Sequence, residues 1–154
     1  MLIRPADSED VLGIRTLAAQ AFGGGYLTEV PTLSVVAEID SRLVGWGGAR
    51  LLGQRHWRLE QVCVAAALQR NGIGTAIVED LLVRISMGGG LQVTAMAWMR
   101  EGRAAIGSVL TRLGFEADEI IPDYWKADSI ERGYICPVCG PVCRCSACRF
   151  TLVF

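Results

Sequence analysis

Five of the six cysteines lie in the last 19 residues of the chain, at spacings that suit metal binding. Cys136 and Cys139 enclose two residues and are followed by a glycine, a pattern typical of zinc knuckles, in which both thiolates approach one metal. Tetrahedral zinc takes four ligands, so one of the five cysteines is spare. The preferred set is Cys136, Cys139, Cys143 and Cys145, with Cys148 as a candidate fifth. The alternative set, Cys136, Cys139, Cys145 and Cys148, consists of two C-x-x-C halves.

Other chemistry fits the same spacing. A redox dithiol and an iron–sulfur cluster are alternatives to zinc. The remaining cysteine, Cys63, stands alone, so the chain is not a disulfide scaffold. Clustered thiols in a reducing compartment are more often metal ligands or redox centres than disulfide bridges. A structural zinc ion is therefore the predicted cofactor of this segment.

A second chemical signal is the glycine turn Gln69-x-x-Gly72-x-Gly74. If it joins a strand to a helix, successive backbone N–H groups point into one concavity at the positive end of the helix dipole, which suits a pyrophosphate. The spacing is neither that of the dinucleotide fingerprint nor that of a P-loop. The alternative is a tight turn that uses glycine only for packing.

The periodicity of apolar residues predicts the elements that position these residues. A short strand at 2–4 precedes a helix, capped by Asp7 or Ser8, that runs to Phe22. Further strands are predicted at 33–39, 43–52, 57–64 and 91–98, helices at 75–85 and 102–113, and an extended segment at 115–126. The early strands read as an antiparallel meander, and the strand, helix and strand from 57 to 98 as a parallel pair with a crossover. The prediction is an α/β (α+β) fold with a mixed central sheet.

Composition sets limits on function. The 154 residues carry 15 Lys+Arg against 16 Asp+Glu, and 51% are hydrophobic, so a sizeable core is expected and a basic nucleic-acid-binding surface is disfavoured. No apolar run approaches the length of a membrane helix, and acidic residues precede any apolar run at the N-terminus. We therefore expect a cytoplasmic protein without a membrane partner.

The segment from Leu59-Glu60-Gln61-Val62-Cys63-Val64 through the glycine turn to Leu113-Gly114-Phe115 closely resembles the GNAT superfamily of N-acetyltransferases. The resemblance spans about Leu2 to Lys126 and implies the acyl-CoA N-acyltransferase fold, with acetyl-CoA as cosubstrate. It implies that the backbones of Val62, Cys63 and Val64 pair with the pantetheine arm as an added strand. It also implies that the following residues hold the pyrophosphate: Gln69, Arg70, Asn71, Gly72, Ile73, Gly74 and Thr75.

Acetyl transfer to an amine needs an electrophile activator and a proton acceptor. The Val62 N–H is the candidate donor to the thioester oxygen, on which negative charge develops. Strand alternation predicts that Glu60 shares a face with Val62 and Val64, so Glu60 is the candidate base, directly or through water, or an anchor for a cationic substrate. The alternative for Glu60 is a structural ion pair with Arg58 or Arg50.

The sequence also departs from the family pattern. Leu110 occupies the position where many members carry a tyrosine that protonates the departing thiolate. Either the thiolate leaves unassisted, or Tyr124 or Ser108 serves as the acid. The predicted function is acetyl transfer from acetyl-CoA to a primary amine, on a small molecule or a protein, by direct attack in a ternary complex. The alternative is a non-catalytic acyl-CoA-binding or regulatory module with a zinc-stabilised interaction tail.

The predicted domain division is an acetyltransferase domain at 1–128 and a cysteine-rich tail at 129–154, with 129–133 as a linker. The tail ends in the apolar, β-prone run Arg149–Phe154. Left free, such a run is an aggregation hazard. We expect it to pack as a strand against the enzyme core or a second subunit, which makes a homodimer a further prediction.

Overall fold

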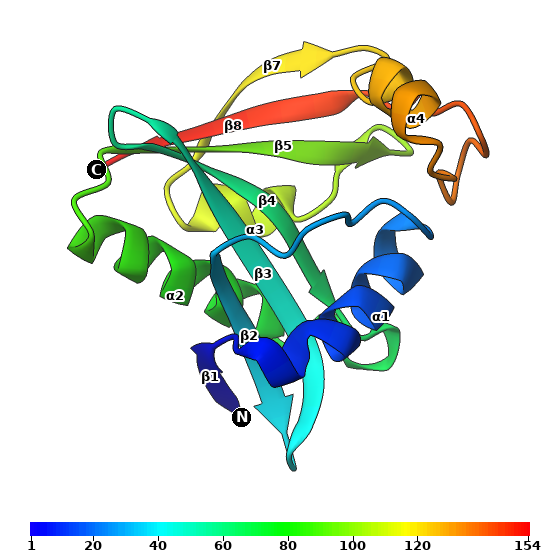
Figure 1. Ribbon diagram of the computed structural model, residues 1–154. Coiled ribbons are helices and arrows are strands. Elements are labelled where there is room, and N and C mark those ends of the chain that lie inside the picture. The colour runs from blue at the N-terminus through cyan, green and yellow to red at the C-terminus, as the bar shows by residue number, and fades with distance from the viewer.

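The computed structural model describes all 154 residues, which build one twisted mixed sheet with helices on both faces (Figure 1). The sheet order is β1-β2-β3-β4-β5-β8-β7, and the short β6 pairs with β5 beside that path. The strands are β1 Leu2–Pro5, β2 Leu33–Ile39, β3 Arg42–Gly53, β4 His56–Val64, β5 Gln92–Arg100, β6 Arg103–Ala104, β7 Glu116–Ile121 and β8 Ala147–Val153. The α-helices are α1 Val11–Phe22, α2 Ile73–Met87, α3 Gly107–Arg112 and α4 Lys126–Arg132.

All neighbouring strands are antiparallel except β4 and β5, which confirms the predicted mixed sheet with a meander and a crossover. The parallel pairing covers only His56–Leu59 against Gln92–Ala95, although both strands continue beyond it. After Leu59 the two strands diverge, and β5, β8 and β7 cross the direction of β2, β3 and β4 in Figure 1. This divergence opens the middle of the sheet on one side.

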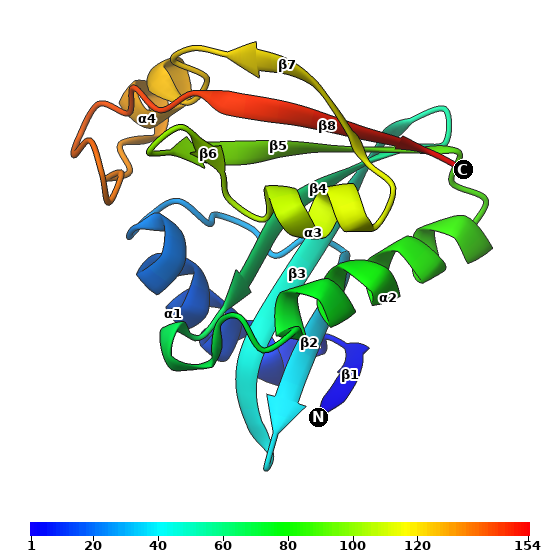
Figure 2. The same ribbon diagram turned by 180° about the vertical axis from the view of Figure 1, so that it is seen from behind.

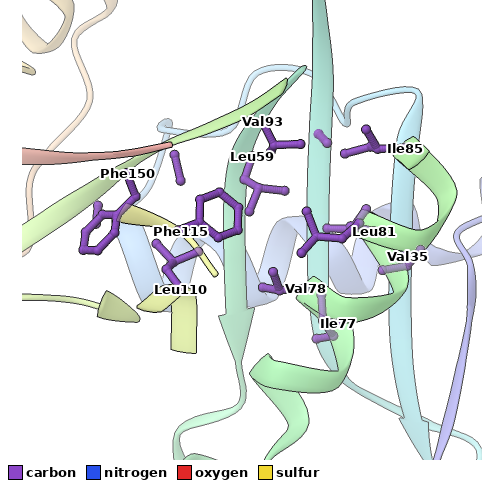
Figure 3. Packing of buried hydrophobic residues seen from close by; sticks show 14 of the residues in the cluster. Val35, Leu59, Ile77, Val78, Leu81, Ile85, Val93, Leu110, Phe115 and Phe150 are labelled. Carbon is purple, nitrogen blue, oxygen red and sulfur yellow. The ribbon is translucent and has the colours of Figure 1, made fainter. Parts of the chain in front are cut away.

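Two hydrophobic clusters hold the helices to the sheet. The larger one joins α2 and α3 to one face and includes Ile77, Leu81 and Leu110, and Figure 3 shows these side chains packed against Leu59 and Val93 of the strands. The smaller one joins α1 to the opposite face. Figure 2, seen from behind, shows α2 and α3 in front of the sheet.

Gly47 of β3 explains how closely α2 approaches the sheet. A Cβ at this position would lie 2.4 Å from Ile77 Cγ2 and 3.0 Å from Leu81 Cδ1, inside van der Waals contact. Gly47 pairs with Val62 of β4. The glycine therefore sets the distance between α2 and β3, beside the strand β4 on which the candidate site residues lie.

Three predicted elements were wrong. The helix predicted at 102–113 is shorter, because Glu101 and Gly102 adopt positive φ and turn the chain back, so that β6 pairs with β5 before α3 begins. The extended segment predicted to reach residue 126 stops with β7, at Ile121. Most of the predicted linker at 129–133 belongs to α4, which ends at Arg132 and is followed by Gly133 with φ of 70° as its C-cap.

The C-terminal run does form a strand packed on the core, as predicted. β8 pairs antiparallel with β5 on one edge and with β7 on the other. The predicted tail is thus divided between a cysteine loop and a central strand of the same sheet that carries residues 1–128. Both edges of β8 are used within the chain, so this strand offers no edge to a second subunit, and the homodimer stays a prediction.

None of the helices combines the length and the hydrophobicity needed to cross a bilayer.

Candidate functional site

The divergence of β4 and β5 forms an apolar cleft of about 110 Å³. Its floor is Leu59–Val62 of β4 and Ala95–Trp98 of β5, and Ala105 and Ile106 border it on the α3 side. The far wall comes from segments distant in sequence: Phe22, Tyr26, Trp125, Tyr134, Cys136, Pro137 and Cys143. The cysteine loop is therefore part of the candidate site.

The backbone of β4 exposes alternate groups to this cleft. The Ala65 N–H donates to Val44 O of β3 at 2.8 Å, so the backbone groups of Cys63, two residues earlier, also face β3. Those of Val62 and Val64 face the open edge, and the Val64 carbonyl accepts from Gln69 Nε2 at 3.1 Å. The backbone of Val62 and the N–H of Val64 are therefore free on this edge, whereas the Val64 carbonyl is used by Gln69. Contrary to the prediction, the backbone of Cys63 is already used within the sheet.

A β-bulge changes the orientation of Glu60. The register steps from Gly48 opposite Gln61 to Ala49 opposite Leu59, which leaves Glu60 as an extra residue. Its Oε1 accepts from Arg50 Nε at 3.0 Å and lies 3.5 Å from Arg58 Nη2. Glu60 therefore lies on the face of Arg58, opposite Val62 and Val64, and the predicted shared face was wrong.

The ion pairs that the sequence offered as the alternative for Glu60 are both present. The Oε2 atom makes no hydrogen bond or ion pair. Glu60 lines both the cleft and an adjoining groove.

The predicted glycine turn joins β4 to α2 through a 3-10 turn at Ala66–Leu68. Gly72 has φ of 80° and precedes the helix, which lets the chain enter α2 sharply. The first intrahelical bond recorded at this end is from Ala76 N–H to Gly72 O, so the N–H groups of Ile73, Gly74 and Thr75 have no helical acceptor. The first turn of α2 contains no acidic residue. Such an end suits an external anion.

The side chains of the turn have local roles. Asn71 Nδ2 donates to the carbonyls of Leu68 and Gln69, at 3.1 and 3.2 Å. Ile73 is buried in the main core, so only its backbone is available to a ligand. Arg70 is exposed and has φ of 65°.

A polar groove of about 460 Å³ adjoins the cleft on the α1 side of the sheet. Three arginines and three carboxylates line it: Arg50, Arg58, Arg132, Glu29, Glu60 and Asp128. Asp128 pairs with Arg132 at 2.8 Å, and Glu60 with the other two arginines. The groove is therefore balanced in charge.

Aromatic residues that sequence reasoning missed shape the join between cleft and groove. Tyr26 contacts Tyr134 edge-on, with ring centroids 5.1 Å apart, and the Arg132 guanidinium lies over both rings. Burial raises the pKa of Tyr26, so its phenol stays protonated at neutral pH. The Tyr134 hydroxyl donates to Asp128 Oδ2 at 2.9 Å. The only signal in the sequence was the presence of aromatics in segments without periodicity.

Tyr124 and Leu110 bear on the missing general acid. Tyr124 lines the groove but not the apolar cleft, and its ring packs edge-on against Trp125. Leu110 is fully buried between α3 and the sheet, so this position presents no side chain to the cleft.

Four cysteines meet in the loop between α4 and β8. The sulfurs of Cys136, Cys139, Cys143 and Cys145 all lie within 4.8 Å of one another. Two of these distances are 3.5 Å (Cys139 to Cys145) and 3.9 Å (Cys136 to Cys145). A zinc ion with Zn–S bonds of about 2.3 Å requires sulfurs about 3.8 Å apart. The preferred set of four therefore fits tetrahedral zinc.

The surroundings of the sulfurs also suit a cation. The N–H groups of Cys139 and Arg144 point at the sulfurs of Cys136 and Cys139, each at 3.4 Å. Burial acts to raise the pKa of Cys136, but N–H donors bring that pKa below its ordinary value, whereas burial raises the pKa of Cys143 to about 12. Three of the four cysteines are buried and Cys139 is exposed. A divalent cation would offset the cost of holding their four thiolates together.

The other two cysteines lie elsewhere. Cys148 is in β8, opposite Ala97 of β5, and its side chain belongs to the main core. The alternative set that included Cys148 is therefore not the one that the fold brings together. Burial raises the pKa of Cys63 to about 12, so its thiol is not a nucleophile at neutral pH.

Comparison with known proteins identifies the family of the chain. The sequence model of the acetyltransferase (GNAT) family matches residues 12–115. The chain therefore belongs to the GNAT acetyltransferase family, which confirms the resemblance drawn from residues 59–115. No curated protein sequence matches the chain significantly.

Solved structures share the fold over almost their whole length. A ribosomal-protein-alanine N-acetyltransferase from Brucella melitensis superposes with a TM-score of 0.76 at 16% identity, covering 100% of both chains. An aminoglycoside 6'-N-acetyltransferase complexed with coenzyme A gives 0.74 at 15% identity, covering 99% of this chain and 97% of that one. Rv2747 from Mycobacterium tuberculosis, in complex with CoA, gives 0.68 at 24% identity, covering 100% and 99%. At these identities the likeness establishes the fold.

Proposed function

We propose that this protein transfers the acetyl group of acetyl-CoA to a primary amine by direct attack in a ternary complex. The observation that carries the proposal is the open edge of β4 beside the N-terminus of α2. Val62 lines the cleft, Val64 continues the same open edge, and the N–H groups at 73–75 have no helical acceptor. One extended cosubstrate can use both: its pantetheine arm as an added strand, and its pyrophosphate at the helix end.

The chemistry follows from these positions. The neutral amine attacks the thioester carbonyl, the C–N bond forms, and the C–S electron pair leaves as the CoA thiolate. The Val62 N–H faces the cleft and is the proposed donor to the oxygen that becomes negative. The amine proton passes to Glu60 Oε2, directly or through water, and then to solvent.

The assay is thiol release from acetyl-CoA over a panel of amines, with initial rates measured against both substrates. Intersecting double-reciprocal lines are expected for a ternary complex. Parallel lines would indicate an acetyl-enzyme and refute direct attack.

Glu60→Gln tests the proton acceptor. We expect kcat to fall by about 100-fold or more and the acid limb of the pH profile to disappear. Glu116→Gln, on the exposed edge strand β7, is the control. An unchanged turnover and pH profile in Glu60→Gln would leave Glu60 as a structural ion-pair partner only.

We further propose that Cys136, Cys139, Cys143 and Cys145 hold a structural zinc ion. The distances between the four sulfurs support this proposal. Cys136 and Cys143 also line the cleft, so an ion that held them would support this wall of the cleft. Ser129 ties the loop to α4, because its Oγ accepts from the Cys143 N–H at 2.9 Å. When bound, zinc would supply no chemistry to the reaction and would fix the shape of this wall.

The second candidate is an acyl-CoA-binding module without turnover. The burial of Leu110 favours it, because no side chain at this position can protonate the thiolate. Tight CoA binding without thiol release from any amine would support this candidate over the transferase.

A further inference from the structure

The groove beside the cleft contains two buried polar atoms that lack partners. Arg58 Nε and Gln61 Oε1 are both shielded from solvent and make no hydrogen bond. Both residues line the groove, and Gln61 also lines the cleft. A buried donor and a buried acceptor left unpaired cost free energy, which a ligand with the complementary groups recovers.

These two atoms lie on either side of Glu60 in the bulged part of β4. Glu60 uses Oε1 for Arg50 and Arg58 and leaves Oε2 free. Two guanidinium groups thus share one carboxylate oxygen, which gives this point of the groove one excess positive charge. Glu60 Oε2 and, on the following residue, Gln61 Oε1 are two acceptors without hydrogen-bond partners. This part of the groove therefore combines excess positive charge with acceptors for N–H donors.

The charge of the whole groove narrows the ligand class. Its three arginines are matched by three carboxylates, of which only Glu29 has no ion-pair partner. An acceptor with several positive charges would require a surplus of carboxylates, and a purely anionic one could not use the two acceptors. A small zwitterion meets both requirements.

We propose that the acceptor is a small amine that carries a carboxylate, of the amino-acid class. Its carboxylate is held by Arg58 and Arg50, and its amine is directed to Glu60 and Gln61 at the mouth of the cleft. Arg50 and Arg58 are then specificity-determining residues. This inference rests on the proposed acetyl transfer and names the acceptor class of that site.

The experiment compares each of the twenty common L-amino acids with its C-terminal amide as acceptor, by thiol release from acetyl-CoA. We expect kcat/KM to be at least about 10-fold higher for the best acid than for its amide, because hydrogen bonds to charged groups are worth about that much. Arg58→Gln is expected to raise KM for the acid by about 10-fold or more and to bring the acid-to-amide ratio close to one. Arg50→Gln, at an exposed position, should change KM and the acid-to-amide ratio in the same direction without disturbing buried structure.

Arg42→Gln is the matched control. Arg42 is exposed at the start of the same strand, β3, and makes no ion pair. It should keep the wild-type preference for the acid. Equal rates for acids and amides would overturn the inference while leaving the transferase in place, and so would acetylation of peptide N-termini with no free amino acid accepted.

A binding measurement keeps the inference testable if no amine releases thiol. The same acid and amide pairs are then titrated by calorimetry onto the CoA-bound protein. The inference is supported, although the transferase has failed, if an acid binds, its amide does not, and Arg50→Gln abolishes binding of the acid. Equal binding of the two, or none, overturns it.

Discussion

The first turn of α2 offers a prediction in which stability and ligand binding change in opposite directions. Thr75 is half-buried in this turn, which has no acidic residue and three N–H groups without helical acceptors. Thr75→Asp places a negative charge at the positive end of the helix dipole. Stability should rise by about 0.3–1 kcal/mol, a Tm increase of about 1–4 °C for a chain of this size.

The same charge would face the pyrophosphate of bound CoA. Two charges about 5 Å apart repel by about 1–3 kcal/mol at effective dielectric constants of about 80 to 20. CoA should therefore bind about 5- to 150-fold more weakly to Thr75→Asp, and the deficit should shrink as salt is raised.

Calorimetric titration of CoA and thermal unfolding measure the two effects on the same samples. Thr75→Asn, of the same size without the charge, is the control. If the Asp and Asn variants bind CoA equally, the pyrophosphate does not lie at this helix end, and the placement of the cosubstrate is refuted.

Three more predictions concern packing, metal and pH. Gly47→Ala should cost about 1–3 kcal/mol of stability, because its Cβ would lie 2.4 Å from Ile77. Thermal unfolding measures this cost, with Gly24→Ala as the control, because nothing lies within 4 Å of a Cβ at that position. Equal Tm values for the two variants would contradict the close packing at Gly47. Elemental analysis of the purified protein should find one zinc ion per chain. Cys143→Ser should lose the zinc, whereas Cys148→Ser should retain it. Equal metal content in the two variants would refute the assigned ligands. The hydrogen bond from Arg4 lowers the pKa of buried Asp10 below its ordinary value of 3.8, so the ionised carboxylate stabilises the fold above that pH, and this stability is lost as the pH falls through the folded-state pKa. Asp10→Asn should therefore be less stable at neutral pH and lose less stability on acidification. Parallel Tm curves for the two proteins from pH 7 to 3 would disprove the linkage.

The sequence by itself determined the fold class and supplied the residues of the proposed cosubstrate site. Apolar periodicity located the meander, the crossover and α2, because these long elements bury one regular face. The glycine turn and the stretch from Val62 to Val64 lie close together in the sequence, so their relation to each other is set by local geometry. The same holds for the four cysteines, which a short loop brings together.

Tertiary structure decided the arrangement of the residues around the proposed acceptor site. The bulge at Glu60 reversed the face predicted from alternation, because one inserted residue moves a side chain to the other side of a strand. The helix predicted from 102 began only at 107, because β6 paired with β5 first. Tyr26 and Tyr134 meet across 108 residues of sequence, which no local pattern encodes. The proposed acceptor site is assembled from loops whose positions depend on long-range packing, whereas the proposed cosubstrate site is built from residues close in sequence, whose backbone conformation their own sequence specifies.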